Sequence, residues 1–118
     1  MSQSEFFLLH RWGKSETSKD PGTIYLLLKE LDAAEDDEHV SVSVREESGW
    51  SVTAYVSGLV VFENVEDLAE QPQHLSGQTR DQARMLMEFL ATGELVLLRQ
   101  QAWRAGYGPA PIQDPTQE

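Results

Sequence analysis

Three consecutive segments that alternate between apolar and polar residues constrain the fold of this 118-residue chain more than any other feature. Valine recurs at every second position in residues 40–45, and residues 50–56 alternate in the same way from Trp50 onward. Residues 59–62 form a shorter and more continuous apolar run. The connections at residues 47–49 and 57–58 both end in glycine, as hairpin turns often do. The pattern predicts an antiparallel three-stranded meander with one face on the core and one face partly in contact with water.

Two further segments have the 3.6-residue period of an amphipathic helix. The first has Asp20 as its N-cap, followed by a proline that suits the first helical position, and is expected to end near residue 33 or 34. The second starts at Thr79 with Gln82 in the position of a capping box, and Gly93 suits its C-terminal cap. Residues 94–103 are compatible with a helix or a strand, and we favour a short helix after a tight turn. The expected apolar stripes are Ile24, Leu27, Leu28 and Leu31 in the first helix and Ala83, Leu86, Met87 and Leu90 in the second.

The rest of the chain adds one strand and several connections. Residues 6–12 are aromatic and aliphatic, so they predict a strand that lies centrally in the sheet. Residues 14–19 are expected to be a polar loop, and residues 63–77 to be irregular with a short helical turn at 65–68. The predicted fold class is α+β, an antiparallel sheet of about four strands with two to three helices packed on one face. We expect a single α+β domain over residues 1–111 and a disordered tail over residues 112–118.

The composition argues against several kinds of chemistry. The chain has no cysteine, which excludes disulfides, thiolate metal sites and a thiol nucleophile. The N-terminal residues lack the features of a signal peptide, and no apolar run approaches the roughly 20 residues that span a bilayer, so we expect a cytoplasmic protein. His10, His39 and His74 fall in different predicted elements, and no serine lies in a glycine-framed nucleophile motif. We therefore predict no metal, no cofactor and no enzymatic activity.

The net charge of −11 is concentrated in one third of the chain. Between Glu30 and Glu70 there are twelve acidic residues and one basic residue, Arg45, whereas acids and bases balance elsewhere. A field of one sign steers and holds a basic partner, and it opposes binding to a phosphate backbone. We therefore expect a basic protein partner and neither a nucleic acid nor a membrane.

The acidic residues fall into three stretches that follow or flank the predicted meander, so they could converge at its ends. Trp50 or Tyr55 would then supply an aromatic hot spot. In the alternative interpretation, the acidic residues form a solvated face that only keeps the protein soluble. The predicted partner-binding residues are Glu35, Asp36, Asp37, Glu38, Glu46, Glu47, Tyr55, Glu63, Glu66, Asp67 and Glu70.

Five short stretches between residues 50 and 107 form a recognisable pattern: Trp50, GLVVFEN at residues 58–64, PQHL at 72–75, residues 86–93 and WRAGY at 103–107. Together they resemble small bacterial immunity proteins. Proteins of this type are cytoplasmic antidotes encoded beside secreted polymorphic toxins, as in type VI and contact-dependent systems. The resemblance implies binding to a cognate toxin without catalysis. For a nuclease toxin, an acidic antidote would mimic the phosphate chain.

Two other classes of function fit a small acidic α+β chain. A secretion chaperone or adaptor holds extended effector segments on a large apolar patch and commonly dimerises, whereas we expect a monomer or a weak dimer. A small hydrolase or sensor domain requires a deep pocket in which groups with shifted pKa values converge. An exposed apolar patch or such a pocket would separate these classes from an immunity protein.

Overall fold

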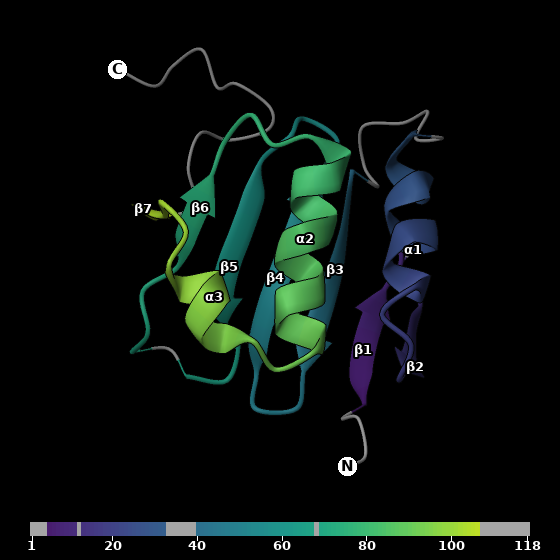
Figure 1. The fold of residues 1–118 in the computed structure, drawn as a ribbon, viewed down its shortest axis with the longest axis horizontal. Coiled ribbons are helices and arrows are strands. Elements are labelled where there is room, and N and C mark those ends of the chain that lie inside the picture. The colour runs from purple at the N-terminus through teal and green to yellow at the C-terminus, as the bar shows by residue number, and fades with distance from the viewer. Residues whose placement is uncertain (1–4, 12, 33–39, 68, 107–118) are drawn as a thin grey trace.

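The computed structural model describes residues 5–11, 13–32, 40–67 and 69–106, which form seven strands and three helices. The strands make one antiparallel sheet in the order β2-β1-β3-β4-β5-β6-β7. The helices lie on the same side of the sheet, and α2 crosses β3 and β4 (Figure 1). The strands are β1 (Phe6–Leu9), β2 (Ser15–Ser18), β3 (Ser41–Glu46), β4 (Trp50–Tyr55), β5 (Val60–Asn64), β6 (Gln73–Leu75) and β7 (Arg104–Ala105), and the helices are α1 (Thr23–Asp32), α2 (Arg80–Ala91) and α3 (Leu95–Arg99).

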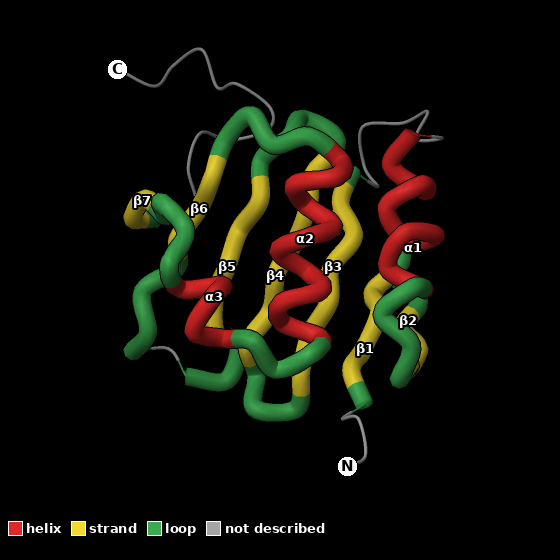
Figure 2. Tube along the Cα trace, viewed as in Figure 1, coloured by secondary structure: helices red, strands yellow, loops and turns green. Residues whose placement is uncertain are grey.

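The predicted meander is confirmed in β3, β4 and β5. Val52 of β4 lies between Val44 of β3 and Phe62 of β5 in the register of the sheet, and all three side chains are buried beneath the helices. The alternate positions of the same strands point to the other side, which carries no helix among the described residues (Figure 2). We call this side the open face of the sheet.

The prediction of about four strands understates the sheet. β2 lies within residues 14–19, which were expected to be a loop, and β6 lies within the segment that was expected to be irregular. β2 is an edge strand in which three of the four residues are exposed, so its polar sequence shows no apolar alternation. β6 has three residues and β7 has two, which is too short for a period to be detected. β1 lies between β2 and β3, as its apolar run predicted, but it ends at Leu9.

The first helix begins two residues later than its sequence suggests. Asp20 and Pro21 form a turn in which the Asp20 carboxylate accepts a hydrogen bond from the Gly22 N–H at 2.9 Å. The carbonyls of Asp20 and Pro21 then accept the N–H groups of Thr23 and Ile24, each at 3.0 Å. The expected apolar stripe of α1 is confirmed, since its four residues are buried.

The second helix follows the prediction closely. The hydroxyl of Thr79 accepts the Gln82 N–H at 3.1 Å, and the Gln82 side chain accepts the Thr79 N–H at 2.8 Å, which completes the capping box. Gly93 follows the helix with a φ of 80°. Residues 95–99 form α3, which confirms the choice of a helix for this segment. Within the described part of the chain, no helix has the length and apolar character needed to cross a membrane.

The core lies between the sheet and the helices. An aromatic group closes it at one side, where Phe62 stacks on Trp50 with ring centroids 4.8 Å apart and also contacts Trp103 at 5.3 Å. The indole of Trp103 donates a hydrogen bond to the Leu98 carbonyl at 2.7 Å, which holds α3 against the aromatic group. The tail expected at residues 112–118 lies outside the described residues. The other core residues are Phe6, Leu8, Ile24, Leu27, Leu28, Leu31, Val42, Val44, Val52, Ala54, Val60, Ala83, Leu86, Met87, Leu90, Ala91 and Leu98.

Candidate functional site

Two of the three acidic stretches meet at one end of the sheet. β3 and β5 both run antiparallel to β4, so they run in the same direction and end at the same edge. The turn at residues 47–49 therefore lies beside the segment that follows β5, and the Val65 N–H donates to the Gly49 carbonyl at 2.8 Å. The turn between β3 and β4 lies at the bottom of Figure 1. We call this end the acidic end, defined by Glu46, Glu47, Glu63, Glu66, Asp67 and Glu70.

Asn64 fixes the two acidic segments relative to each other. Its Nδ2 donates to the Ser48 carbonyl at 3.3 Å, across from β5 to the β3–β4 turn. Its Oδ1 accepts the N–H groups of Glu66 at 2.9 Å and Asp67 at 3.0 Å. Residues 65–67 therefore form an asparagine-stabilised turn where a helical turn was expected, and residue 68 of the expected turn lies outside the described residues. The acidic side chains are therefore presented by backbone that is held in place.

The carboxylates at this end differ in what they contact. Glu46 is used internally, because its Oε2 accepts the Trp50 N–H at 2.9 Å and the Ser48 hydroxyl. Asp67 is exposed and accepts the Ala69 N–H at 3.1 Å. Glu47 and Glu66 are exposed and accept no hydrogen bond from the described residues. Glu47 and Glu66 are thus the carboxylates best placed to meet a partner's cations.

The other predicted acidic residues lie either outside the described residues or in the segment that follows β5. Glu35, Asp36, Asp37 and Glu38 lie outside the described residues. The Glu70 N–H donates to the Asp67 carbonyl at 3.1 Å, so Glu70 belongs to the same segment as Asp67.

Neither aromatic candidate lies in the acidic end. Tyr55 ends β4, roughly 17 Å from its first residue at 3.3 Å per residue, so its backbone lies at the opposite end of the sheet. Burial, and then the charge of Glu63, raises the pKa of the Tyr55 hydroxyl above its usual 10.0. Trp50 points to the helix side, where the Arg99 guanidinium lies 4.6 Å from its ring centroid. Trp50 is therefore part of the aromatic group in the core and not of the open face.

A shallow groove of about 350 Å³ lies on the open face beside the acidic end. Phe7 and Leu9 of β1 form its apolar part, and Gly13 and Ser15 line one end. Glu46, Glu47 and Glu66 line the other end, with Arg45 between the two parts. We call this hollow the β1 groove.

Arg45 has an unusual environment for a guanidinium group. It lies in one row of the open face with Phe7, Ser51 and Glu63, which are paired across β1, β3, β4 and β5. Its Nε is buried and has no hydrogen-bond partner, and no ion pair among the described residues includes it. A buried donor without an acceptor costs about 1–3 kcal/mol, and more when it is charged. Among the described residues, Arg45 is therefore a cation whose Nε–H donor has no acceptor.

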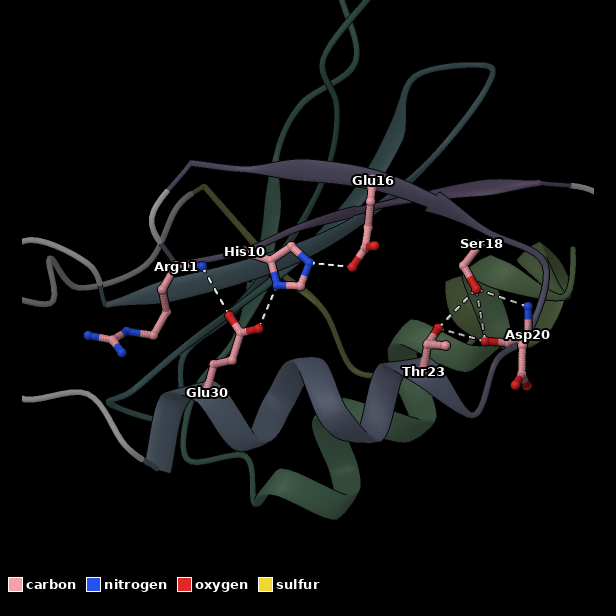
Figure 3. Close-up of polar contacts among 7 residues, drawn as sticks. All are labelled: His10, Arg11, Glu16, Ser18, Asp20, Thr23 and Glu30. Carbon is pink, nitrogen blue, oxygen red and sulfur yellow. Dashed lines mark hydrogen bonds and ion pairs between the residues drawn. The ribbon is translucent and has the colours of Figure 1, made fainter.

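A second cluster of charged residues, around His10, joins the β1–β2 hairpin to α1 (Figure 3). The Nδ1 of His10 lies 2.5 Å from Oε2 of Glu30, and the Nε2 of His10 lies 2.6 Å from Oε2 of Glu16. The other oxygen of Glu30 accepts the Arg11 N–H at 3.3 Å. Burial alone lowers the pKa of His10, but the hydrogen bonds and charges of Glu30 and Glu16 outweigh it and raise the pKa above 6.5. Both ring nitrogens therefore donate, which is the arrangement of a structural imidazolium.

Comparisons of the chain with protein-family models, with curated proteins and with solved structures found no match.

Three residues of this region were not anticipated from the sequence. Glu5 precedes β1 at the acidic end, because Phe6 pairs with Glu46, and so it adds an acid from the opposite part of the chain. Phe7 and Arg45 face each other across β1 and β3 on the open face. Alternation from the buried Phe6 and Leu8 would have placed Phe7 outward, but only the long-range pairing of β1 with β3 brings it to Arg45.

Within the described residues no group of three or more His, Asp and Glu side chains could hold a metal ion. His74, expected in a loop, lies in β6 and is buried, with Nδ1 donating to the Gly106 carbonyl at 3.0 Å. A second hollow of about 100 Å³ lies between α1 and α2, where Arg80 pairs with Asp32 at 3.1 Å. His10 and Tyr55, whose pKa values are displaced, line neither hollow.

Proposed function

We propose that this chain is a stoichiometric inhibitor that binds and neutralises a basic bacterial toxin in the cytoplasm of the cell that makes it. The observation that supports the proposal is the convergence of two separate acidic segments at one end of the sheet, held by Asn64. Like charges brought together in this way repel each other and lower the stability of the free protein. A basic partner relieves the repulsion, whereas a solubility surface does not require the charges to be gathered and fixed.

The mechanism is electrostatic attraction followed by close charge pairing. The field of the acidic end attracts the basic groove of the toxin and orients the two proteins as they approach. Glu47 and Glu66 are exposed and then pair with basic side chains that would otherwise contact substrate. For a nuclease toxin, the carboxylates take the places of backbone phosphates and block the active site. No reaction by this chain is required.

The direct test begins with the gene that neighbours this one. Co-expression with the C-terminal domain of an adjacent secreted toxin, followed by purification, should yield a stable complex of one copy of each protein. The toxin's activity should fall in proportion to the amount of this chain that is added. A neighbouring toxin domain that neither co-purifies nor loses activity would contradict the proposal.

The dependence of the association rate on ionic strength tests the electrostatic part of the proposal. Raising the ionic strength from about 0.01 M to about 0.15 M shortens the Debye length from about 30 Å to about 8 Å. The association rate measured by stopped flow should therefore fall about tenfold or more over this range. An association rate that does not change with ionic strength would leave binding possible but remove the acidic end as its cause.

Charge reversal should locate the interface. Glu47→Lys and Glu66→Lys change exposed carboxylates that accept no hydrogen bond from the described residues, whereas Glu46 supports the turn and is a poor choice. Asp81→Lys is the matched control, because its side chain is 89% exposed and it lies in α2. α2 begins beside the opposite end of the sheet, where Gln78 N–H donates to Gly58 O. The first two variants should bind the toxin much more weakly, and the control should bind as the wild type does.

A secretion chaperone or adaptor is the second candidate, and one observation favours it. Leu26 of α1 is 63% exposed and Val96 of α3 is 70% exposed, with Tyr25 and Leu97 beside them. Exposed apolar side chains on helices can hold an extended effector segment. A dimer in light scattering, together with binding that does not depend on salt, would support the chaperone and contradict the toxin inhibitor.

A further inference from the structure

The β1 groove combines an apolar floor with a carboxylate rim. Phe7 and Leu9 form the floor, and Phe7 remains 37% exposed although it is a large aromatic residue in an interior strand. The groove volume of about 350 Å³ lies within the range of about 300–1,000 Å³ that ligand sites occupy. The groove is therefore large enough to receive a side chain of another molecule.

The charges around the groove select the sign of its occupant. Glu46, Glu47 and Glu66 contribute three carboxylates, and Arg45 contributes one cation. The lining is negative overall, and the rest of the acidic end adds to the same field. This negative charge favours a cationic occupant. An anion that approached Arg45 would have to pass the carboxylate rim.

The shape and chemistry of the floor suit a long cationic side chain. Arginine and lysine carry an aliphatic stem that packs on apolar surface while the charged head reaches polar groups. Phe7 offers an aromatic face, on which a guanidinium stacks favourably. The head can then reach Glu47 and Glu66, whose carboxylates accept no hydrogen bond from the described residues.

Arg45 lines the groove together with the floor and the rim. Its Nε is buried and has no hydrogen-bond partner among the described residues, so a group that enters the groove does not reach this atom. The floor and the rim therefore identify the occupant, as a cationic side chain with an aliphatic stem.

We infer that the β1 groove is the subsite that receives an arginine or lysine side chain from a loop of the basic partner, with Phe7 as its platform and Glu47 and Glu66 as its charge partners. This inference rests on the proposed function for the identity of the partner, and it extends that function by naming the chemical group that is recognised and the place where it binds.

The inference can be tested with the intact chain and a small probe. The probe is a blocked Gly-Arg-Gly peptide, and the matched control is the same peptide with citrulline, which keeps the shape and lacks the charge. Titration followed by two-dimensional amide NMR should shift the signals of Phe7 and Glu66, and the citrulline peptide should bind at least about tenfold more weakly than the arginine peptide. Equal binding of the two peptides, or shifts confined to other residues, would overturn the inference. Acetate that shifts the groove signals where the arginine peptide does not would identify an anion site instead.

Variants of the chain localise the effect. Glu47→Gln combined with Glu66→Gln should weaken the arginine peptide about tenfold, and Phe7→Leu should weaken it while keeping an apolar floor. Asp81→Asn removes an exposed carboxylate outside the groove and should change nothing. Unchanged binding to the groove variants would overturn the inference.

The two proposals fail in different ways. If the peptide binds in the groove but no basic toxin forms a complex, the subsite stands and the toxin-inhibitor function fails. If a toxin binds and the Phe7→Leu and Glu66→Gln variants neutralise it as well as the wild type does, the function stands and the subsite inference is overturned.

Discussion

The side chain of Asn64 lies against the space that a Cβ atom on Gly49 would need. A methyl group placed on Gly49 would come within 2.6 Å of Asn64 Oδ1 and 3.0 Å of the Glu66 side chain. Gly49 also has a φ of +98°, which residues with a side chain rarely adopt. The close packing of the two acidic segments therefore depends on a glycine in one and an asparagine in the other.

Gly49→Ala should lower the free energy of unfolding by about 2–4 kcal/mol, because backbone strain and a steric clash add together. Gly77→Ala is the matched control, since Gly77 also has a positive φ, +68°, but has open space around its Cβ position. It should cost only about 1 kcal/mol, from strain alone. Urea denaturation of the two variants measures the difference. Equal losses would show that the contact with Asn64 is not what restricts residue 49.

Asn64→Ala should cost about 1–3 kcal/mol, because it leaves the Glu66 and Asp67 N–H groups and the Ser48 carbonyl without their partner. Asn64→Asp keeps the acceptor oxygen for the two N–H groups but loses the Nδ2 donor and adds a charge to the acidic end. Its instability relative to the wild type should shrink as salt is added, whereas that of Asn64→Ala should not. Unfolding measured at low and at high ionic strength distinguishes the two. A salt-independent Asp variant would contradict the description of this end as a concentrated negative field.

The parts of the fold that were predicted from sequence are those in which one segment carries its own signal. The alternation in β3 and β4 and the Thr79 capping box are local patterns, and each is found where it was expected. β2 was not predicted because this edge strand, with the sequence Ser-Glu-Thr-Ser, has no apolar residues that would indicate a buried face. Its pairing with β1 is visible only in three dimensions.

The same distinction explains which features of the candidate site could be predicted from the sequence and which could not. Convergence of the Glu46–Glu47 turn and the Glu63–Asp67 segment was predictable, because alternate strands of a meander end at the same edge. The β1 groove was not, because it depends on β1 lying beside β3, which are separated in sequence by β2 and α1. Tyr55 was named as a candidate hot spot for the acidic surface; its backbone lies at the far end of β4, although the charge of Glu63 helps to raise the pKa of its hydroxyl.

His10 should make the stability of the protein depend on pH in the neutral range. Its pKa is raised in the folded state, so its contribution is fully present below the ordinary value of 6.5 and is lost as the pH rises through the folded pKa. The free energy of unfolding should therefore fall above pH 6.5, and His10→Asn should flatten this part of the profile. A wild type that gains stability over the same range would contradict the Glu16–His10–Glu30 arrangement.

Glu30→Gln tests the stronger half of this cluster, in which a carboxylate on α1 bonds His10 and the Arg11 N–H. Loss of a charged, partly buried partner should cost about 1–3 kcal/mol below pH 6.5 and less above it, because the imidazolium is then no longer favoured. Glu88→Gln is the control, since Glu88 is on the surface of α2 with Arg84 at 3.8 Å and should change stability by less than about 0.5 kcal/mol. Chemical unfolding at several pH values supplies the comparison.

The acidic end should reduce the stability of the free protein, and this cost separates an interface from an ordinary solvated surface. Glu47 and Glu66 are exposed carboxylates near other acids, and no hydrogen bond from the described residues offsets their repulsion. Glu47→Gln combined with Glu66→Gln should therefore leave the chain as stable as the wild type or more stable at low salt. Added salt should stabilise the wild type more than this variant, because it screens a repulsion that the variant lacks. The measurement is the urea midpoint of both proteins at low and high ionic strength. A variant that is less stable than the wild type at low salt would mean that the carboxylates stabilise the fold, and the argument that they are kept for a partner would lose its physical basis.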